Sequence, residues 1–181
     1  DVKKVSNSKI LYPFFISMYI NIGAPIMAVT TPIGNSTVGI ITRAKISAQT
    51  IALWSRALHA VPNSKILLRN VGLDQPSLQR RILGHFESSG ITPDRIQFLG
   101  RGSHSEFLAT YNQIDIGLDT TPYSGGLTTL EAIWMGVPVL TRGGPNFASR
   151  HSITHLSHCG LERWVHETDD SFIQDCVYWS E

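Results

Sequence analysis

Cysteine is scarce in this 181-residue sequence, which contains only Cys159 and Cys176. Two thiols without a C-x-x-C pair form no disulfide framework and are typical of a protein from a reducing compartment. Charge is also limited, because charged residues make up 16% of the chain and the formal net charge is +1. Such a balance gives no reason to expect a nucleic acid or an anionic membrane as the main partner.

No charged residue occurs between Ile10 and Thr42. A membrane-spanning helix needs about twenty consecutive apolar residues, whereas this stretch contains residues that interrupt helices. They are Pro13, Asn21, Gly23, Pro25, Pro32, Gly34 and Asn35. We therefore expect residues 1–36 to form an extended linker or the remnant of a preceding lobe, with a membrane or signal role as the alternative.

Two nucleotide-binding motifs are missing from the chain. The dinucleotide fingerprint G-x-G-x-x-G fails, because Gly100 and Gly102 are followed by Ser105 where the third glycine should stand. The phosphate loop G-x-x-x-x-G-K-[ST] does not occur either. These absences disfavour a nicotinamide-dependent dehydrogenase and a P-loop NTPase.

After residue 36, short apolar segments alternate with segments of helical periodicity. We expect strands at 38–41, 65–69, 95–99, 114–118 and 137–140, and helices at 47–61, 76–89, 103–111, 128–135, 148–159 and 171–179. This alternation predicts a Rossmann-like α/β domain over residues 37–181, with a parallel sheet covered by helices on both faces. Ligands bind such sheets at the carboxyl ends of the strands. We expect the hydrophobic core to include Trp54 and Trp134.

The segment Asp119–Glu131 joins a predicted strand end to a helix start. Gly125 and Gly126 lack side chains, so their backbone can approach a ligand closely. A helix that begins near Leu127 presents free N–H groups and a partial positive charge, which suit a phosphate.

Three further side chains of this segment suit a nucleotide. Thr128 and Thr129 add hydroxyl donors at the helix start, and Glu131 lies about one turn inside, where a carboxylate can accept both hydroxyls of a ribose. The structural alternative is that Thr128 caps the helix and Glu131 is a favourable acid in the first turn.

Several collinear motifs resemble the C-terminal catalytic lobe of O-GlcNAc transferases, including the SPINDLY-type relatives of plants. The motifs are Lys45–Ser47, Val61–Ser64, Asp115–Asp119, Pro122–Gly126, Thr128–Glu131, Trp134–Pro138 and Ala148–Arg150. The resemblance covers roughly residues 24–172. It implies an inverting, metal-independent transferase of the GT-B architecture, in which this lobe holds the UDP portion of UDP-N-acetylglucosamine or a related donor. A protein hydroxyl is the implied acceptor, and no cofactor is implied. We expect a cytoplasmic location, because the donor is available there and the sequence contains no convincing export signal.

The resemblance also implies roles for individual residues. Lys45 matches the lysine that contacts the diphosphate and offsets the charge on the leaving UDP. Thr128 and Thr129 match the region that contacts phosphate, and Glu131 matches the acid that holds the ribose. Gly102 and Ser103 match the loop whose backbone faces the uracil.

Two positions depart from the family pattern. Phe107 and Gly126 stand where family members carry histidines, so Phe107 can only stack on or pack beside a base and Gly126 offers only its backbone amide. Arg150, after the fifth predicted strand, is a second-rank candidate for a phosphate contact, together with Arg142.

The chain has only about thirty-five residues before its first predicted strand, too few for a second Rossmann-like lobe. We therefore expect half of a catalytic unit that transfers no sugar alone and requires an N-terminal lobe. Two alternatives remain: a non-catalytic nucleotide-binding module or degenerate fragment, and a nucleotide-sugar epimerase of the same architecture.

Two other clusters invite a metal hypothesis. His151, His155 and His158 share one helix face by spacing, but a polar helix face or a phosphate contact explains them as well. Asp115 and Asp119 lie about 13 Å apart along a strand, so Asp119 is expected to order the loop instead. We expect no metal.

Overall fold

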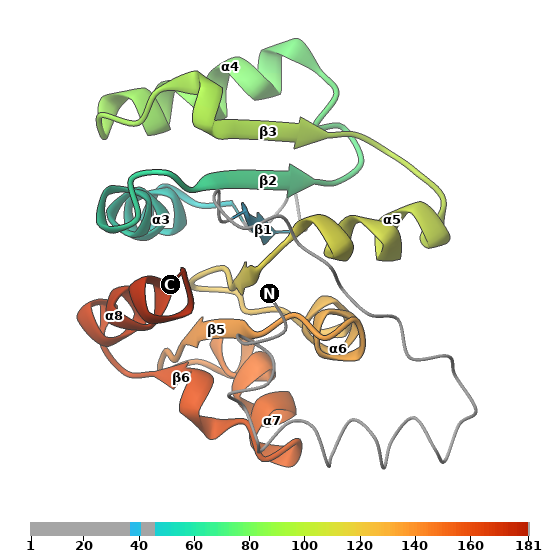
Figure 1. The fold of residues 1–181 in the computed structure, drawn as a ribbon, viewed down its shortest axis with the longest axis vertical. Coiled ribbons are helices and arrows are strands. Elements are labelled where there is room, and N and C mark those ends of the chain that lie inside the picture. Colours follow the sequence, from blue (N-terminus) through green and yellow to red (C-terminus); the bar gives the residue numbers. More distant parts are fainter. Residues whose placement is uncertain (1–36, 41–45, 181) are drawn as a thin grey trace. The chain divides into compact units, whose positions relative to one another are not determined.

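The computed structural model describes residues 37–40 and 46–180, which fall within a compact unit that extends from Gly34 to Glu181. Six parallel strands form one sheet in the order β3-β2-β1-β4-β5-β6 (Figure 1). The strands are β1 Thr37–Ile40, β2 Lys65–Arg69, β3 Ile96–Leu99, β4 Ile116–Leu118, β5 Val139–Arg142 and β6 Val165–His166. This parallel sheet confirms the predicted α/β class.

Six helices of the described region flank the sheet, with α3 and α8 on the left of Figure 1 and α5 and α6 on the right. Their bounds are α3 Ala48–Ala60, α4 Pro76–Ser88, α5 His104–Thr110, α6 Leu127–Trp134, α7 His151–His158 and α8 Asp169–Ser180. Short 3₁₀ turns are η2 Pro93–Arg95, η3 Tyr111–Gln113, η4 Phe147–Ser149 and η5 Glu162–Trp164. Helix α3 packs against α4 and α8, whereas α6 packs against α7. Among the described residues, no helix has the length and apolar character needed to cross a membrane.

Local sequence signals explain where several elements begin and end. Ser47 caps α3, since its hydroxyl accepts a hydrogen bond from the backbone N–H of Thr50. Gly90 follows α4 with φ +78°, a conformation that favours glycine and ends the helix. Trp54 of α3 is fully buried, as predicted, and so is the apolar run Ile66–Leu68 of β2.

The structure corrects several details of the sequence prediction. Trp134 is 37% exposed rather than part of the core, because the buried side of α6 is formed by Thr129, Ala132 and Ile133. Thr128 is not the cap of α6; Gly126 occupies that position without a side-chain hydrogen bond. The helix expected from residue 148 begins at His151, after the 3₁₀ turn η4. Strand β6 has two residues, too few to give a periodic signal.

The strand order fixes where a ligand can enter the sheet. Chain connections run from β1 toward β3 on one side and from β4 toward β6 on the other, so the order reverses between β1 and β4. In parallel α/β sheets the ligand crevice lies at the carboxyl ends of the strands at this reversal. The loop that follows β4, from Asp119 to Gly126, starts at that point.

Candidate functional site: the loop between β4 and α6

Asp119 is the hydrogen-bonding centre of the loop. One carboxylate oxygen accepts from the backbone N–H groups of Thr120 at 2.8 Å and Gly125 at 2.7 Å. The other accepts from the hydroxyl of Thr141 on β5 at 2.6 Å. Burial raises the pKa of Asp119, and hydrogen bonds from neighbouring hydroxyl and backbone N–H groups oppose that shift. The expectation that Asp119 orders the loop is confirmed.

The start of helix α3 supports the same loop from one side. The hydroxyls of Ser47 and Thr50 both donate to the carbonyl of Thr121, and the backbone N–H of Thr121 donates back to the Thr50 hydroxyl. The indole of Trp54 donates to the carbonyl of Asp119 at 3.3 Å. Four hydrogen bonds therefore fix the loop to α3, which follows β1 along the chain.

The start of helix α7 supports the loop from the other side. The Ser124 hydroxyl donates to the carbonyl of Ala148 and accepts from the backbone N–H groups of His151 and Ser152. The backbone N–H of Ser124 also donates to Ala148, at 2.9 Å. Two backbone N–H groups in the first turn of α7 therefore already donate to the Ser124 hydroxyl.

Gly125 has a packing role in the structure. Its backbone N–H is engaged by Asp119, and a Cβ at this position would lie 2.3 Å from the hydroxyl of Thr129. That hydroxyl is buried and lies 2.8 Å from the hydroxyl of Ser152. Thr129 and Gly125 thus hold α6 against α7.

The first turn of α6 is the more open part of the loop. No described atom lies within 4 Å of a Cβ built on Gly126, Leu127 is 69% exposed, and Thr128 is half-buried. Helix geometry leaves the first N–H groups of α6 without intrahelical partners. This turn therefore combines open space, amide donors and one hydroxyl, which together suit an anion.

Glu131 lies one turn farther along α6, with a side chain that is 12% exposed. Its Oε1 is 3.8 Å from Nε2 of His104, the first residue of α5. Burial raises the pKa of Glu131, and the charge of His104 opposes this shift. The structure thus brings the predicted ribose-holding acid next to the predicted uracil-facing segment.

Phe107 of α5 contacts two other rings of the site. Its ring is parallel to that of His104, with centroids 6.5 Å apart, and meets Tyr111 edge-on at 6.0 Å. The Tyr111 hydroxyl donates to the carbonyl of Thr128 at 3.0 Å, and burial raises the pKa of Tyr111. Phe107 also packs against the buried cluster that includes Val139, so part of its ring serves the core.

Gly102 and Ser103 form the turn that enters α5. The Ser103 N–H donates to the carboxylate of Glu106 at 2.7 Å, and the Ser103 hydroxyl caps the helix, so the two residues form a capping box. Gly102 approaches Arg69 so closely that a Cβ would lie 2.0 Å from a guanidinium nitrogen. Arg69 itself donates to the carbonyl of Glu106 at 2.8 Å.

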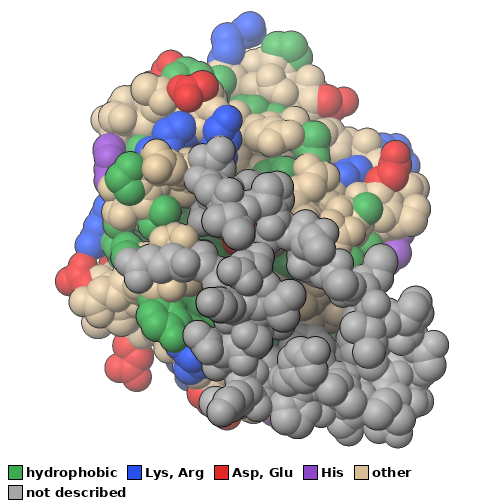
Figure 2. Space-filling view, viewed as in Figure 1, with side chains coloured by type: hydrophobic (Ala, Val, Ile, Leu, Met, Phe, Trp, Pro, Cys, Tyr) green, Lys and Arg blue, Asp and Glu red, His purple; other side chains and the backbone are tan. Residues whose placement is uncertain are grey.

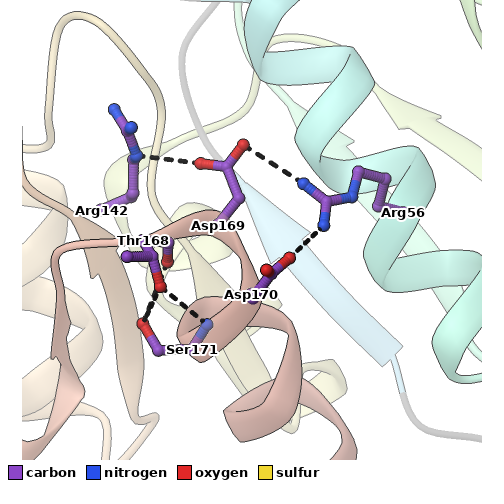
Figure 3. Close-up of polar contacts among 6 residues, drawn as sticks. All are labelled: Arg56, Arg142, Thr168, Asp169, Asp170 and Ser171. Carbon is purple, nitrogen blue, oxygen red and sulfur yellow. Dashed lines mark hydrogen bonds and ion pairs between the residues drawn. The ribbon is translucent and has the colours of Figure 1, made fainter.

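The two candidate arginines differ in their contacts. Arg142 pairs with Asp169 at 2.9 Å, and the same carboxylate pairs with Arg56 of α3, which also reaches Asp170 (Figure 3). This arrangement joins β5, α3 and α8. Arg150 remains exposed and donates to the carbonyl of Gly144 at 3.3 Å, so it is the better placed of the two for a ligand.

Lys45 lies outside the described residues.

Burial lowers the pKa of His155, and the charges of His151 and His158 add to this shift. Within residues 46–180, no group of three or more His, Cys, Asp or Glu side chains is arranged to hold a metal ion. Figure 2 shows acidic, basic and apolar side chains interspersed on the visible described surface.

Sequence reasoning missed several residues that shape the site. His104, Tyr111 and Ser152 each contact a predicted site residue across elements. Their partners lie 17 to 27 residues away, so no local motif marks them. The only local signal is the position of His104 directly after the helix cap Ser103.

Comparison with known proteins places these features in a family. Residues 41–179 match Glycosyl transferase family 41. The probable UDP-N-acetylglucosamine–peptide N-acetylglucosaminyltransferase SPINDLY of Solanum lycopersicum is 33% identical over 135 residues, which cover 74% of this chain and 14% of that protein. The UDP-N-acetylglucosamine–peptide N-acetylglucosaminyltransferase of Caenorhabditis elegans is 26% identical over 133 residues, 74% of this chain and 11% of that protein.

Solved structures also include an O-GlcNAc transferase among the similar proteins. A mutant O-GlcNAc transferase of Thermobaculum terrenum superimposes with a TM-score of 0.79 at 32% identity, and the match covers 87% of this chain and 31% of that one. The UDP-GlcNAc 2-epimerase of Neisseria meningitidis, with a TM-score of 0.53 at 12% identity over 96% of this chain and 41% of that one, shares the fold alone. This chain, a lobe of GT-B type that spans about one seventh of its SPINDLY relatives, belongs to Glycosyl transferase family 41, the family of O-GlcNAc transferases and SPINDLY.

Proposed function

We propose that this chain is the donor-binding lobe of an inverting, metal-independent glycosyltransferase and holds the diphosphate of a UDP-sugar. The observation that carries the proposal is the loop between β4 and α6. Asp119 fixes this loop at the point where the strand order reverses, and the first turn of α6 is left open beside it. A helix start of this kind binds phosphate through its amides and its partial charge.

The donor is UDP-N-acetylglucosamine and the acceptor is a protein hydroxyl. Support comes from the names of the relatives that share 33% identity over 74% of this chain. An O-GlcNAc transferase also shares the fold at 32% identity. We place this enzyme in the cytoplasm, where nucleotide-sugar donors are available.

Each site residue takes one part of the donor. The α6 amides at Gly126 and Leu127 and the Thr128 hydroxyl hold the phosphates, while Glu131 accepts the ribose hydroxyls. Phe107 packs beside the uracil, next to the turn formed by Gly102 and Ser103. Gly125 and Thr129 keep this helix start in position, and Arg150 is a further phosphate contact.

Lys45 neutralises the charge that develops on the leaving UDP. Because the first turn of α6 supplies further stabilisation of the diphosphate, no metal ion is required. The acceptor and the group that activates its hydroxyl belong to the remainder of the enzyme, since this chain spans 14% of its SPINDLY relatives. The chain alone therefore binds UDP weakly and transfers no sugar.

Calorimetric titration of the purified chain with UDP tests this proposal. We expect saturable binding that Lys45→Ala and Glu131→Ala each weaken about tenfold, the effect of losing one charged contact. Glu87→Ala, at an exposed position of α4, serves as the matched control and should bind as the parent does. Equal binding by all four proteins would contradict the assigned site, and sugar transfer by the chain alone would contradict its role as half of a catalytic unit.

A further inference from the structure

Arg163 lies against two aromatic side chains near the end of helix α8. Its Cζ atom is 4.9 Å from the ring centroid of Trp179 and 5.4 Å from that of Tyr178. The two rings meet edge-on, with centroids 5.5 Å apart. Tyr178 is 57% exposed, and Arg163 is exposed as well. Arg163, Tyr178 and Trp179 therefore form one surface feature, the Arg163 cluster.

The Arg163 cluster lies at the edge of the sheet opposite the donor loop. Arg163 belongs to η5, which directly precedes β6, so it stands at the amino end of this parallel strand. Helix α8 starts beside the carboxyl end of β5, where Asp169 pairs with Arg142. It ends at Ser180, which lines a small cavity together with Ile116 at the amino end of β4. The cluster is therefore separate from the proposed donor site.

The guanidinium of Arg163 has no acidic partner in the part of the chain that the structure describes. Asp175, an acid of the same helix as the two rings, lies instead 3.5 Å from His166. A guanidinium that stacks on a ring uses its face for that contact and keeps its N–H groups available in the plane. Arg163 thus presents several hydrogen-bond donors at the surface, in a position that two rings restrict.

Two indole N–H groups at this end of α8 also lack acceptors. Trp179 meets Trp164 of η5 edge-on, with centroids 6.0 Å apart. The Nε1 atoms of both are buried and have no hydrogen-bond partner among the described residues. Buried donors ordinarily find a partner. This region is therefore rich in donors and poor in acceptors, and the group that complements it is a carboxylate.

The neighbouring charges limit the complementary group to a single carboxylate. Glu162 directly precedes Arg163 and is exposed, and Asp175 lies one turn before Trp179 on α8. These two acids would repel a run of carboxylates or a phosphate-rich polymer. The exposed ring of Tyr178 offers apolar area beside the cation. The surface thus suits one acid with an apolar neighbour.

We propose that the Arg163 cluster docks a segment of a partner polypeptide that carries one acidic side chain beside apolar residues. The carboxylate pairs with the planar guanidinium of Arg163, whose N–H groups match it in a bidentate manner, and an apolar neighbour packs against Tyr178. Arg, Tyr and Trp are the residue types that most often supply the binding energy of protein interfaces. Because the cluster is small, the contact is weak, with a dissociation constant in the millimolar range.

NMR titration of the ¹⁵N-labelled chain with the capped tripeptide acetyl-Leu-Glu-Leu-amide tests this proposal. We expect a saturable shift of the Trp179 indole signal. The tripeptide with Gln in place of Glu should bind about tenfold more weakly, the effect of losing a charged hydrogen bond. Arg163→Gln should weaken binding of the acidic tripeptide to the same extent and should no longer distinguish the two tripeptides. Arg80→Gln, at an exposed position of α4, is the matched control and should bind as the parent does.

Several results would overturn the proposal. They are equal affinity of the parent for both tripeptides, a preference for the acidic tripeptide that persists in Arg163→Gln, and no indole shift at about 10 mM tripeptide. Self-association of the parent that Arg163→Gln abolishes, measured by sedimentation, would assign the surface to a second copy instead. UDP binding should be unchanged in Arg163→Gln, so a failure of the proposed donor site leaves this test unaffected. Circular dichroism confirms that the compared proteins are folded.

Discussion

The backbone nitrogen of Gly125 lies 2.7 Å from a carboxylate oxygen of Asp119, six residues earlier in the chain. This hydrogen bond closes the loop between β4 and α6 onto the end of its own strand. The second oxygen of Asp119 binds the Thr141 hydroxyl of β5, so one side chain joins the loop to two neighbouring strands. The position of the α6 start depends on this arrangement.

Replacing Asp119 with alanine should destabilise the domain strongly. The substitution leaves the N–H groups of Thr120 and Gly125 and the hydroxyl of Thr141 without their acceptor. We expect a loss of about 3 kcal/mol in the free energy of unfolding, measured by urea denaturation. The exposed Asp74 provides the control, and a loss no larger in Asp119→Ala than in Asp74→Ala would refute the central role of Asp119.

The adjacent glycines of the loop should respond differently to alanine. A Cβ at Gly125 meets the Thr129 hydroxyl at 2.3 Å, whereas one at Gly126 meets no described atom within 4 Å. Gly125→Ala should therefore lower the free energy of unfolding by about 2 kcal/mol, and Gly126→Ala should change it by less than about 0.5 kcal/mol. Adding Thr129→Ala to Gly125→Ala removes the clashing oxygen. The loss in the free energy of unfolding should therefore be smaller in the double variant than the sum of the losses in Gly125→Ala and Thr129→Ala. A loss equal to that sum would contradict the predicted steric conflict.

The two threonines of α6 should separate binding from stability. Thr129 is buried against Ser152, while Thr128 is half-buried in the open first turn. We expect Thr128→Ala to weaken UDP binding about fivefold with little effect on the melting temperature, because one hydrogen bond contributes about 1 kcal/mol. Thr129→Ala should instead lower the melting temperature. The reverse pattern would mean that Thr129, not Thr128, contacts the phosphate.

Stability should fall below neutral pH, in part through His166. Burial lowers the pKa of His166, an effect that the carboxylate of Asp175, 3.5 Å away, partly opposes. Because the unfolded chain then binds this proton more readily, the stabilisation is complete above the ordinary imidazole pKa of about 6.5 and is lost as the pH falls below that value and through the lowered pKa of the folded state. Between pH 7.5 and 5.5, His166→Gln should lose about 1 kcal/mol less stability than the parent. The control His85→Gln, at an exposed position of α4, should follow the parent, and an unchanged pH slope in His166→Gln would exclude this role.

Much of the fold could be predicted from sequence because its signals are local. Ser47, Pro76 and the pair of Ser103 with Glu106 mark helix starts, and the apolar runs 66–68 and 116–118 mark buried strands. Strand β6 was missed because two residues cannot show a period. Trp134 was wrongly assigned to the core, since a large apolar residue predicts burial only on average.

The candidate site was only partly predictable, because spacing does not show which donors are already occupied. The sequence indicated that the backbone at Gly125 and Ser103 faces a ligand, yet the N–H groups of these residues donate to Asp119 and Glu106. The contact of His104 with Glu131 joins two helices 27 residues apart, and only the folded chain reveals it. The ligand-binding roles themselves stay predictions.

The most direct test of the central claim is a titration of the ¹⁵N-labelled chain with UDP, followed by amide chemical shifts. We predict that the largest shifts occur in two segments that the fold brings together, residues 102–107 and 126–131. Shifts confined to other parts of the chain, or none at millimolar UDP, would contradict the assignment of this loop as the donor site.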